Sequence, residues 1–301
     1  MRTDQEKERG IHMRFIRQCK AMPVLLAMLL LCSLVLSSGA ESSGPEYDIG
    51  SLNYELVWAD EFDTDGEPDP ARWAFDIGGG GWGNGEMQYY MSSGNAAVEN
   101  GTLSIELRKQ KRGTCSYTSA RMVTRDIADW LYCKIEVSAK LPSGKGTWPA
   151  IWMLPTDRAY GDWPASGEID IMEHVGYDPD VIVQSIHTTN THGDSASNNS
   201  TNVPGVREGF HVYGMEWLPD RIIFSIDGEQ TYVYEKPETD EGKRASDSWP
   251  FDQRMHLLLN LAFGGTWGGS MGIDEKCLPV TLEVDYVRVY QSPEIMALTG
   301  Q

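Results

Sequence analysis

Cysteine and positive charge are both scarce in this chain of 301 residues. It has five cysteines, and no two of them show the Cys-x-x-Cys spacing of a zinc ribbon or a thiol-redox site. Lysine and arginine number 25 against 44 aspartate and glutamate residues, which gives a formal net charge of −19. Nucleic acid and anionic membranes are poor partners for so acidic a surface, and we exclude both.

Long hydrophobic runs are missing except near the N-terminus. Residues 23–36 form an apolar run that is too short for a comfortable transmembrane span. Basic residues precede this run and Ser38-Gly39-Ala40 follows it, an order that predicts a signal peptide over 1–40. Met13 is an alternative start, and an N-terminal anchor is the alternative reading. We expect a secreted protein, extracellular or periplasmic, without membrane contact after cleavage.

About 260 residues remain after cleavage, enough for one large all-β domain. We expect a short linker over 41–53, a single domain over 54–291 and a tail over 292–301 that is disordered or is the end of a linker. The cleaved chain has a net charge of about −22 and three cysteines. An odd number leaves at least one free thiol or an intermolecular bridge, and a Cys115–Cys133 bridge stays open. We expect a monomer.

Long amphipathic helical stretches are also absent, and so are internal repeats. Instead, short runs with a period of two residues recur between Gly, Asn, Asp and Pro, which is typical of strands with two different faces. The clearest are YELVWADEF, GTLSIELRK, YTSARMVTR, LYCKIEVSAKL, EIDIMEHV, VIVQSIHTT, HVYGMEWLP, RIIFSID, MHLLLNLAF and LEVDYVRVYQ. Many short strands at close spacing predict an all-β fold, an antiparallel sandwich or jelly roll.

Three carboxylates interrupt one of these strands, in the segment GEIDIMEHVG. Glu168 and Asp170 lie two positions apart and therefore point to the same face of a strand. Glu173 lies an odd five positions from Glu168, so a regular strand would turn it to the opposite face. A one-residue bulge near Ile171-Met172 would restore the parity, and we predict that it does.

Carboxyl groups this close cannot all ionise at neutral pH, because each charge opposes the next. One ionised and one protonated carboxyl group are what a retaining glycosidase needs, one to attack the anomeric carbon and one to protonate the leaving oxygen. A solvated acidic strand face, or one edge of a calcium site, is the alternative. Five tryptophans beside Gly, Pro or Thr favour a cleft that stacks sugars: Trp82, Trp148, Trp152, Trp163 and Trp267.

The pattern E-x-D-x-x-E in GEIDIMEHVG resembles the signature of glycoside hydrolase family 16 in its bulged form. The surrounding segments are similar to the laminarinase branch of that family, the endo-β-1,3-glucanases, and follow the family's order from Leu56 to Gln291. They are LVWADEFD, GGGGWGNGEMQYY, YTSARMVT, KLPSGKGTWPAIWMLP, WPASGEIDIMEHVG, SIHTT, HVYGMEW, HLLLNLAFGGTWGG and VDYVRVYQ.

The resemblance implies a β-jelly-roll sandwich of two curved antiparallel sheets with an open substrate cleft on the concave face. It implies that Glu168 is the nucleophile, Glu173 the general acid/base and Asp170 a helper. It also implies contacts with the sugar for Asn84, Arg121, Trp148, Trp152, Trp163, His187 and Trp267. For His187, a hydrogen-bonded structural role within the sheet is the alternative.

No cofactor is implied for catalysis, but the resemblance implies a structural calcium ion on the convex side. Its ligands would be the Glu61 side chain, the Gly101 carbonyl and the Asp285 side chain, since oxygen ligands suit this cation. An ordinary solvent-facing strand residue is the alternative for Asp285.

The implied activity is that of a secreted, endo-acting, retaining hydrolase that cleaves internal β-1,3-glucosidic bonds of laminarin-type β-glucans. Mixed-linkage β-1,3-1,4-glucan and agar-type galactan are alternative substrates, and a transglycosylase is an alternative enzyme. A carbohydrate-binding jelly roll without catalysis is the alternative from another class. Binding alone needs no cluster of three acids, and this argues against it.

Overall fold

The computed structural model describes residues 47–301, so the predicted signal peptide lies outside the described residues. Within 47–301 the chain is almost entirely β-strand, in two large antiparallel sheets that do not close into a barrel. No helix of this part is long and apolar enough to cross a membrane. The predicted sandwich of antiparallel sheets is confirmed.

The first sheet has eight strands in the order β15-β14-β13-β8-β17-β5-β4, with β1 paired to β17 beside this path. Their bounds are β1 (Glu55–Asp60), β4 (Ala96–Glu99), β5 (Thr102–Leu107), β8 (Lys134–Lys140), β13 (His211–Trp217), β14 (Arg221–Ile226), β15 (Glu229–Glu235) and β17 (Val280–Gln291).

The second sheet has seven strands in the order β12-β11-β10-β9-β16-β7-β2. Their bounds are β2 (Ala74–Phe75), β7 (Arg121–Val123), β9 (Thr147–Pro155), β10 (Glu168–Glu173), β11 (Val181–His187), β12 (Ser197–Asn202) and β16 (Met255–Phe263). A small parallel pair joins β3 (Gln88–Tyr90) to β6 (Tyr117–Ser119).

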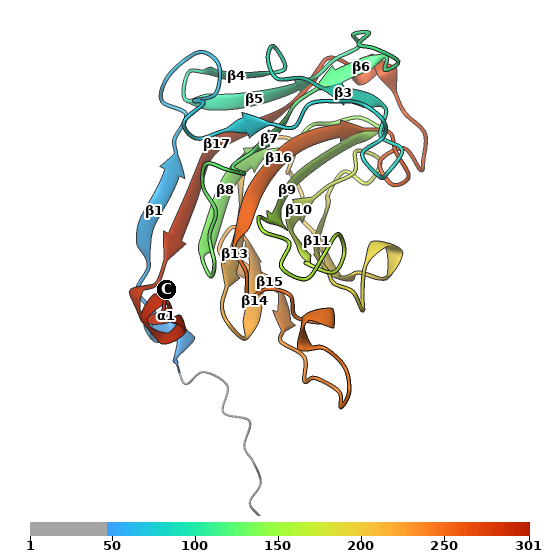
Figure 1. The fold of residues 1–301 in the computed structure, drawn as a ribbon. Helices are drawn as coiled ribbons and strands as arrows, with labels where there is room; N and C mark the ends of the chain where they lie inside the picture. The colour runs from blue at the N-terminus through green and yellow to red at the C-terminus, as the bar shows by residue number, and fades with distance from the viewer. Residues whose placement is uncertain (1–46) are drawn as a thin grey trace, which may run out of the picture. The chain divides into compact units, whose positions relative to one another are not determined.

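The hydrophobic core fills the space between the two sheets. Strand β5 alternates buried and half-buried residues, as its period of two requires, and it contributes Leu103, Ile105 and Leu107 to the core. Strand β10 contributes Ile169 from the opposite sheet. Figure 1 shows the strands bending, with the second sheet lying inside the curve of the first. The outer face of the second sheet is therefore concave and carries the polar residues of β10.

Helical structure is short in the described residues. Four 3-10 turns occupy Ile49–Ser51, Gly193–Ser195, Ala245–Asp247 and Glu275–Cys277. The tail forms an α-helix, α1 (Pro293–Thr299), in place of the disordered segment or linker that we expected. Ser292 caps its N-terminus, Gly300 ends it in the left-handed conformation, and Ile295 is buried in the core.

The bulge predicted in β10 is confirmed. On the β9 side, Asp170 pairs with Trp152 and Met172 pairs with Ile151, so Ile171 is the extra residue. On the β11 side, Asp170 pairs with Ser185 and Glu173 with Val183. The extra residue reverses the alternation of faces, and Glu173 therefore joins Glu168 and Asp170 on the concave face.

Candidate active site

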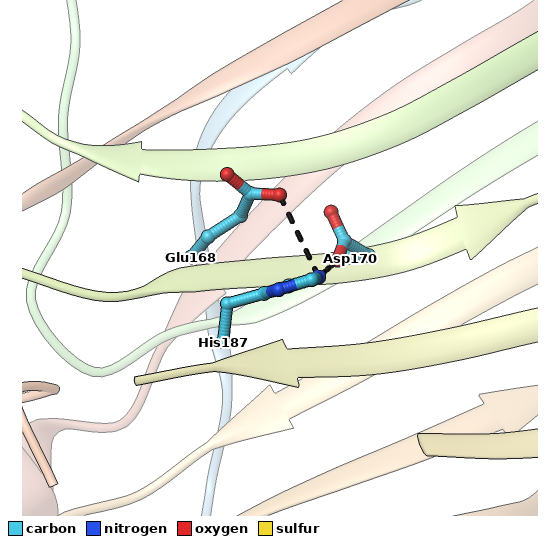
Figure 2. Close-up of side chains that lie close together, drawn as sticks. All are labelled: Glu168, Asp170 and His187. Atoms are coloured by element: carbon cyan, nitrogen blue, oxygen red, sulfur yellow. Dashed lines mark ion pairs between the residues drawn. The ribbon is translucent and has the colours of Figure 1, made fainter. Parts of the chain in front are cut away.

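Glu168, Asp170 and His187 meet on the concave face at the junction of β10 and β11. Glu168 pairs in register with His187, so their side chains are cross-strand neighbours. The His187 Nε2 lies 3.1 Å from Asp170 Oδ2 and 3.8 Å from Glu168 Oε1. Figure 2 shows the imidazole edge turned toward both carboxyl groups. The Asp170 contact lacks the alignment of a hydrogen bond, so it is mainly electrostatic.

A backbone contact fixes the tautomer of His187. The Gly193 amide donates to His187 Nδ1 at 3.1 Å, so this nitrogen is an acceptor and carries no proton. The ring proton of the neutral imidazole is therefore on Nε2, the nitrogen that faces the carboxyl groups. His187 therefore turns its N–H toward Asp170 and Glu168.

Burial raises the pKa of all three carboxyl groups. It raises the pKa of Asp170 to about 8. It also raises the pKa of Glu173 to about 8, with the charge of Asp170 as the second cause. The pKa of Glu168 is raised well above its ordinary value by burial and then by Asp170, while His187 acts to lower it. A proton on Asp170 removes the second cause, so Glu168 ionises most readily when Asp170 is protonated.

Glu173 is held by a tryptophan of the neighbouring strand. Trp148 Nε1 donates to Glu173 Oε1 at 3.0 Å. Trp267 packs edge-on against Trp148, with ring centroids 5.4 Å apart. The two tryptophans therefore form one wall beside Glu173 and orient its carboxyl group.

A row of side chains continues from Glu173 across the sheet. The register pairs Glu173 with Ala150, Ala150 with Asn260, and Asn260 with Arg121. Ala150 is small and lies on β9 between two tryptophans of the same face, Trp148 and Trp152. A small residue between large aromatic ones leaves room for a ring-shaped ligand on this part of the face.

Arg121 forms the far end of this row. Its guanidinium lies over the rings of Trp82 and Trp152, with the Cζ 4.9 Å and 4.6 Å from their centroids. Its Nε lies 3.0 Å from Asp76 Oδ2. Two aromatic faces and one carboxylate therefore fix the position of this cation.

A chain of hydrogen bonds that the sequence did not predict lies under Trp152. Trp152 Nε1 donates to Asn260 Oδ1 at 2.7 Å, and Asn260 Nδ2 donates to the Tyr90 hydroxyl at 3.2 Å. Tyr90 donates to Glu86 at 3.1 Å, and Asn84 donates to the same carboxylate at 3.4 Å. The lone asparagine in the apolar run HLLLNLAF was the signal for Asn260.

Trp163 stands apart from the other aromatic residues, next to the histidines. Its ring centroid lies 5.9 Å from that of His187 and 5.5 Å from that of His192. It is 51% exposed, although it lies beside a buried acid cluster. An exposed indole on this side of the carboxyl groups is available for stacking on a sugar ring.

The structure thus gathers the predicted catalytic and sugar-contacting residues on and around one face, while the predicted calcium ligands lie in or next to strands of the first sheet. Both carboxylate oxygens of Glu61 accept hydrogen bonds from Arg288 at 2.8 Å. Asp285 is exposed at a register shift of β17, and its Oδ2 accepts from Ser138 at 3.2 Å. Gly101 lies in the turn between β4 and β5. Asp285 and the Gly101 carbonyl fit a hard cation, but the Glu61 side chain is occupied by Arg288.

One group of acidic and histidine side chains in residues 47–301 is close enough to hold a metal ion, and it includes two of the predicted catalytic acids. The ligand atoms of Glu168, Asp170 and His187 lie within 4.8 Å of one another. A metal ion would need both carboxyl groups deprotonated, whereas burial favours their protonated forms. Proton transfer suits this cluster better than metal binding.

Known proteins share this fold and these segments. The family model described as "Glycosyl hydrolases family 16" matches residues 84–288. A beta-glucanase from Rhodothermus marinus is 45% identical over 93% of this chain and 97% of its own length. The X-ray structure of the laminarinase from Rhodothermus marinus has a TM-score of 0.77 and 48% identity, covering 80% of this chain and 99% of that one.

A second solved structure has an oligosaccharide bound. It is a variant of SCLam, described as a non-specific endo-beta-1,3(4)-glucanase from family GH16, co-crystallised with 1,3-beta-D-cellotriosyl-glucose. It has a TM-score of 0.75 and 43% identity, and the match covers 79% of this chain and 95% of that one.

Proposed function

The chain belongs to family 16 of the glycosyl hydrolases, and from this membership we propose that it cleaves internal β-1,3-glucosidic bonds of laminarin-type β-glucans. The observation that carries the proposal is the bulge in β10, because it places three carboxyl groups on one concave face beside tryptophans. Carboxyl groups gathered in this way serve glycoside hydrolysis, and aromatic walls serve sugar binding.

We assign the two catalytic steps to the two glutamates. Glu173 protonates the leaving oxygen, since burial raises its pKa to about 8 and it holds a proton at neutral pH. Glu168 attacks the anomeric carbon on the opposite face of the sugar and forms a glycosyl-enzyme. Glu173, now ionised, takes a proton from a water molecule whose oxygen attacks the anomeric carbon. The bond between this carbon and Glu168 breaks, and the sugar leaves with retained configuration. Asp170 holds a proton near Glu168 and so tunes its charge.

The sugar chain lies across the sheet in this proposal. Trp148, Trp152 and Trp163 form aromatic walls around the scissile bond, and Trp267 supports Trp148. The side chains that bind hydroxyl groups are Asn84, Arg121 and His187. The hydrogen bonds and cation–π contacts that hold Arg121 and Trp152 support fixed positions for these contacts.

Product analysis on several polysaccharides tests the substrate. We expect laminarin to be cut into short oligosaccharides faster than lichenan, and no cleavage of agarose or carrageenan. Mixed-linkage β-glucan is the second candidate, because the similar SCLam enzyme is described as acting on β-1,3(4)-glucan. Faster cleavage of lichenan than of laminarin would decide for that candidate, and faster cleavage of a galactan would remove both.

We also propose export of a monomeric enzyme after cleavage at Ala40. The basic, apolar and small-residue order of residues 1–40 supports this. Expression in a host with its own secretion machinery, followed by N-terminal sequencing of the released protein, tests it. A mature chain that begins near Glu41 is expected, and a protein that stays membrane-bound with its apolar run intact would contradict export.

A structural calcium ion at Gly101 and Asp285 is a separate proposal. Glu61 can join as the third ligand only by releasing Arg288. Because an ion that binds only the folded state stabilises it, chelation should lower the melting temperature but leave activity in the cold largely intact. Asp285→Asn should abolish this effect, whereas Asp240→Asn at an exposed position should not. An unchanged melting temperature on chelation of protein shown to contain calcium would contradict the site.

A further inference from the structure

We propose that Gln184 on β11 is a positioning residue that holds the bulge in β10 and thereby places Glu173 on the catalytic face. The proposal rests on the function of Glu173 proposed above. It adds a residue whose side chain faces away from the substrate side of the sheet and touches no catalytic group.

Gln184 lies opposite the bulge. Ser185 pairs with Asp170 and Val183 pairs with Glu173, so Gln184 is the single residue of β11 that faces the two bulged residues of β10. Its Nε2 donates to the Ile171 carbonyl at 3.1 Å, and both groups are buried. Ile171 is the residue without a partner in the β9 register. The amide therefore satisfies a carbonyl at the point where the ladder is interrupted.

The surroundings of Gln184 are apolar, so a glutamine at this position needs a specific reason. Its neighbours on the same face of β11 are Ile182 and Ile186, and all three side chains are fully buried between the sheets. An aliphatic residue would normally occupy such a position, because a buried amide without partners is costly. The requirement that overrides this preference is the carbonyl of the bulge.

The other end of the amide is anchored in the opposite sheet. The Thr231 hydroxyl, on β15, donates to Gln184 Oε1. Asn199, on β12, donates to the Thr231 carbonyl at 3.1 Å. The bulge is therefore tied through Gln184 to the edge strands of both sheets, and its carbonyl cannot rotate without breaking this connection.

The consequence for catalysis concerns Glu173 alone. Glu168 and Asp170 precede the bulge, whereas Glu173 follows it and depends on the extra residue for its orientation. Without the bulge, the alternation of a regular strand would turn Glu173 toward the core. A partial relaxation would already move its carboxyl group away from Trp148 Nε1, which now donates to it at 3.0 Å.

Two substrates separate this role from a general loss of structure. Laminarin has a poor leaving group and needs the acid in the first step, whereas a 2,4-dinitrophenyl β-laminaribioside has a leaving group that departs without a proton. For Gln184→Met, which keeps the size but removes the donor, we expect kcat/KM on laminarin to fall by about 10- to 100-fold. We expect kcat/KM on the aryl glycoside to change by less than about threefold.

The control is Ile186→Ala, on the same face of the same strand, which removes packing but no hydrogen bond to the bulge. It should multiply kcat/KM for both substrates by one common factor, the fraction of protein that remains folded. Should Gln184→Met fail to fold, Thr231→Val decides instead. It leaves Gln184 in place but removes the hydrogen bond to Gln184 Oε1. The ratio of kcat/KM on laminarin to kcat/KM on the aryl glycoside should then fall, by a smaller factor than in Gln184→Met.

Equal losses on both substrates, as in Ile186→Ala, would overturn the positioning role, and so would no loss on either substrate. The wild-type enzyme in the same assays reports separately on the proposed function. If it cuts lichenan in preference to laminarin, the substrate assignment fails. The kcat/KM on lichenan then replaces that on laminarin in the comparison with the aryl glycoside. If it cuts no polysaccharide, both proposals fall.

Discussion

Glu168 and Glu173 share one face of β10 but differ in their contacts. Glu173 accepts a hydrogen bond from Trp148 Nε1, and burial raises its pKa to about 8. Glu168 faces the protonated nitrogen of His187 at 3.8 Å, a contact that favours its ionised form. Burial also raises the pKa of Glu168, so the pKa directions alone do not separate the two roles. The proposed assignment, with Glu173 as the proton donor and Glu168 as the nucleophile, can be tested on each residue separately.

Glu173→Ala should abolish cleavage of laminarin but retain the first step on an aryl glycoside, because a low-pKa phenol departs unprotonated. Azide, a small anion that needs no base, should then attack the glycosyl-enzyme and accelerate turnover. It attacks from the side opposite Glu168, and the product should be the β-glycosyl azide. Product configuration measured by NMR checks this expectation.

Glu168→Ala should be inactive on both substrates, because no nucleophile remains. Azide should enter the vacated space and displace the leaving group directly, which gives the α-glycosyl azide. An α-azide from Glu173→Ala, or a β-azide from Glu168→Ala, would show that the two roles are reversed.

At the level of elements, parity in GEIDIMEHVG showed that the three acids share one face only if the strand has a bulge, and alternation was enough to predict most strands of both sheets. Strand β9 was not among the predicted strands, because its tryptophans and two prolines in TWPAIWMLP are typical of a loop. Tertiary packing overrides this composition, and β9 is central in its sheet.

Edge strands were harder to predict for a different reason. Strand β12 has the sequence SNNSTN, which offers no hydrophobic alternation, and it pairs only with β11.

The role of Gln184 could not be predicted either, since VIVQSIH gives no sign of what its glutamine contacts. Only the register shows that it lies opposite the bulge.

Helix α1 is short, but its sequence contains the signals that start and end a helix. Ser292 at the N-cap, Pro293 at the first position and Gly300 past the end are typical helix boundaries. Ser292 Oγ accepts from the Ile295 amide at 3.4 Å, and the Ile295 side chain packs into the core. The helix thus fastens the end of the chain to the sandwich.

Ser292→Ala should therefore lower the free energy of unfolding by about 1 kcal/mol, the usual effect of losing an N-cap. Denaturant unfolding measured by tryptophan fluorescence checks this. Ser195→Ala, at an exposed serine in the β11–β12 connection, is the matched control and should have no effect. Equal stability of both variants would mean that the cap does not hold the helix.

For the molecule as a whole, the buried acids that serve the proposed catalysis lower the stability of the folded state as the pH rises. The pKa of Asp170 is about 8 in the folded protein and about 3.9 in an unfolded chain. Between these values the folded state keeps a proton that the unfolded state releases. This contribution to stability is therefore fully present below about pH 4 and is lost as the pH rises toward 8.

Asp170→Asn removes this loss of stability at high pH, because an amide does not ionise. Its oxygen still faces His187 Nε2, which lies 3.1 Å from Asp170 Oδ2 in the wild type. The melting temperature of the variant should exceed that of the wild type by roughly 5 °C or more at pH 8, with little difference at pH 4. Activity should fall without disappearing, since Asp170 tunes the charge of Glu168 and forms no bond to the sugar. Asp194→Asn makes the same side-chain substitution at an exposed position and should show no such pH dependence. A melting-temperature difference of equal size at pH 4 and pH 8 would mean that Asp170 is not a buried proton carrier, and the proposed protonation of the cluster would be wrong.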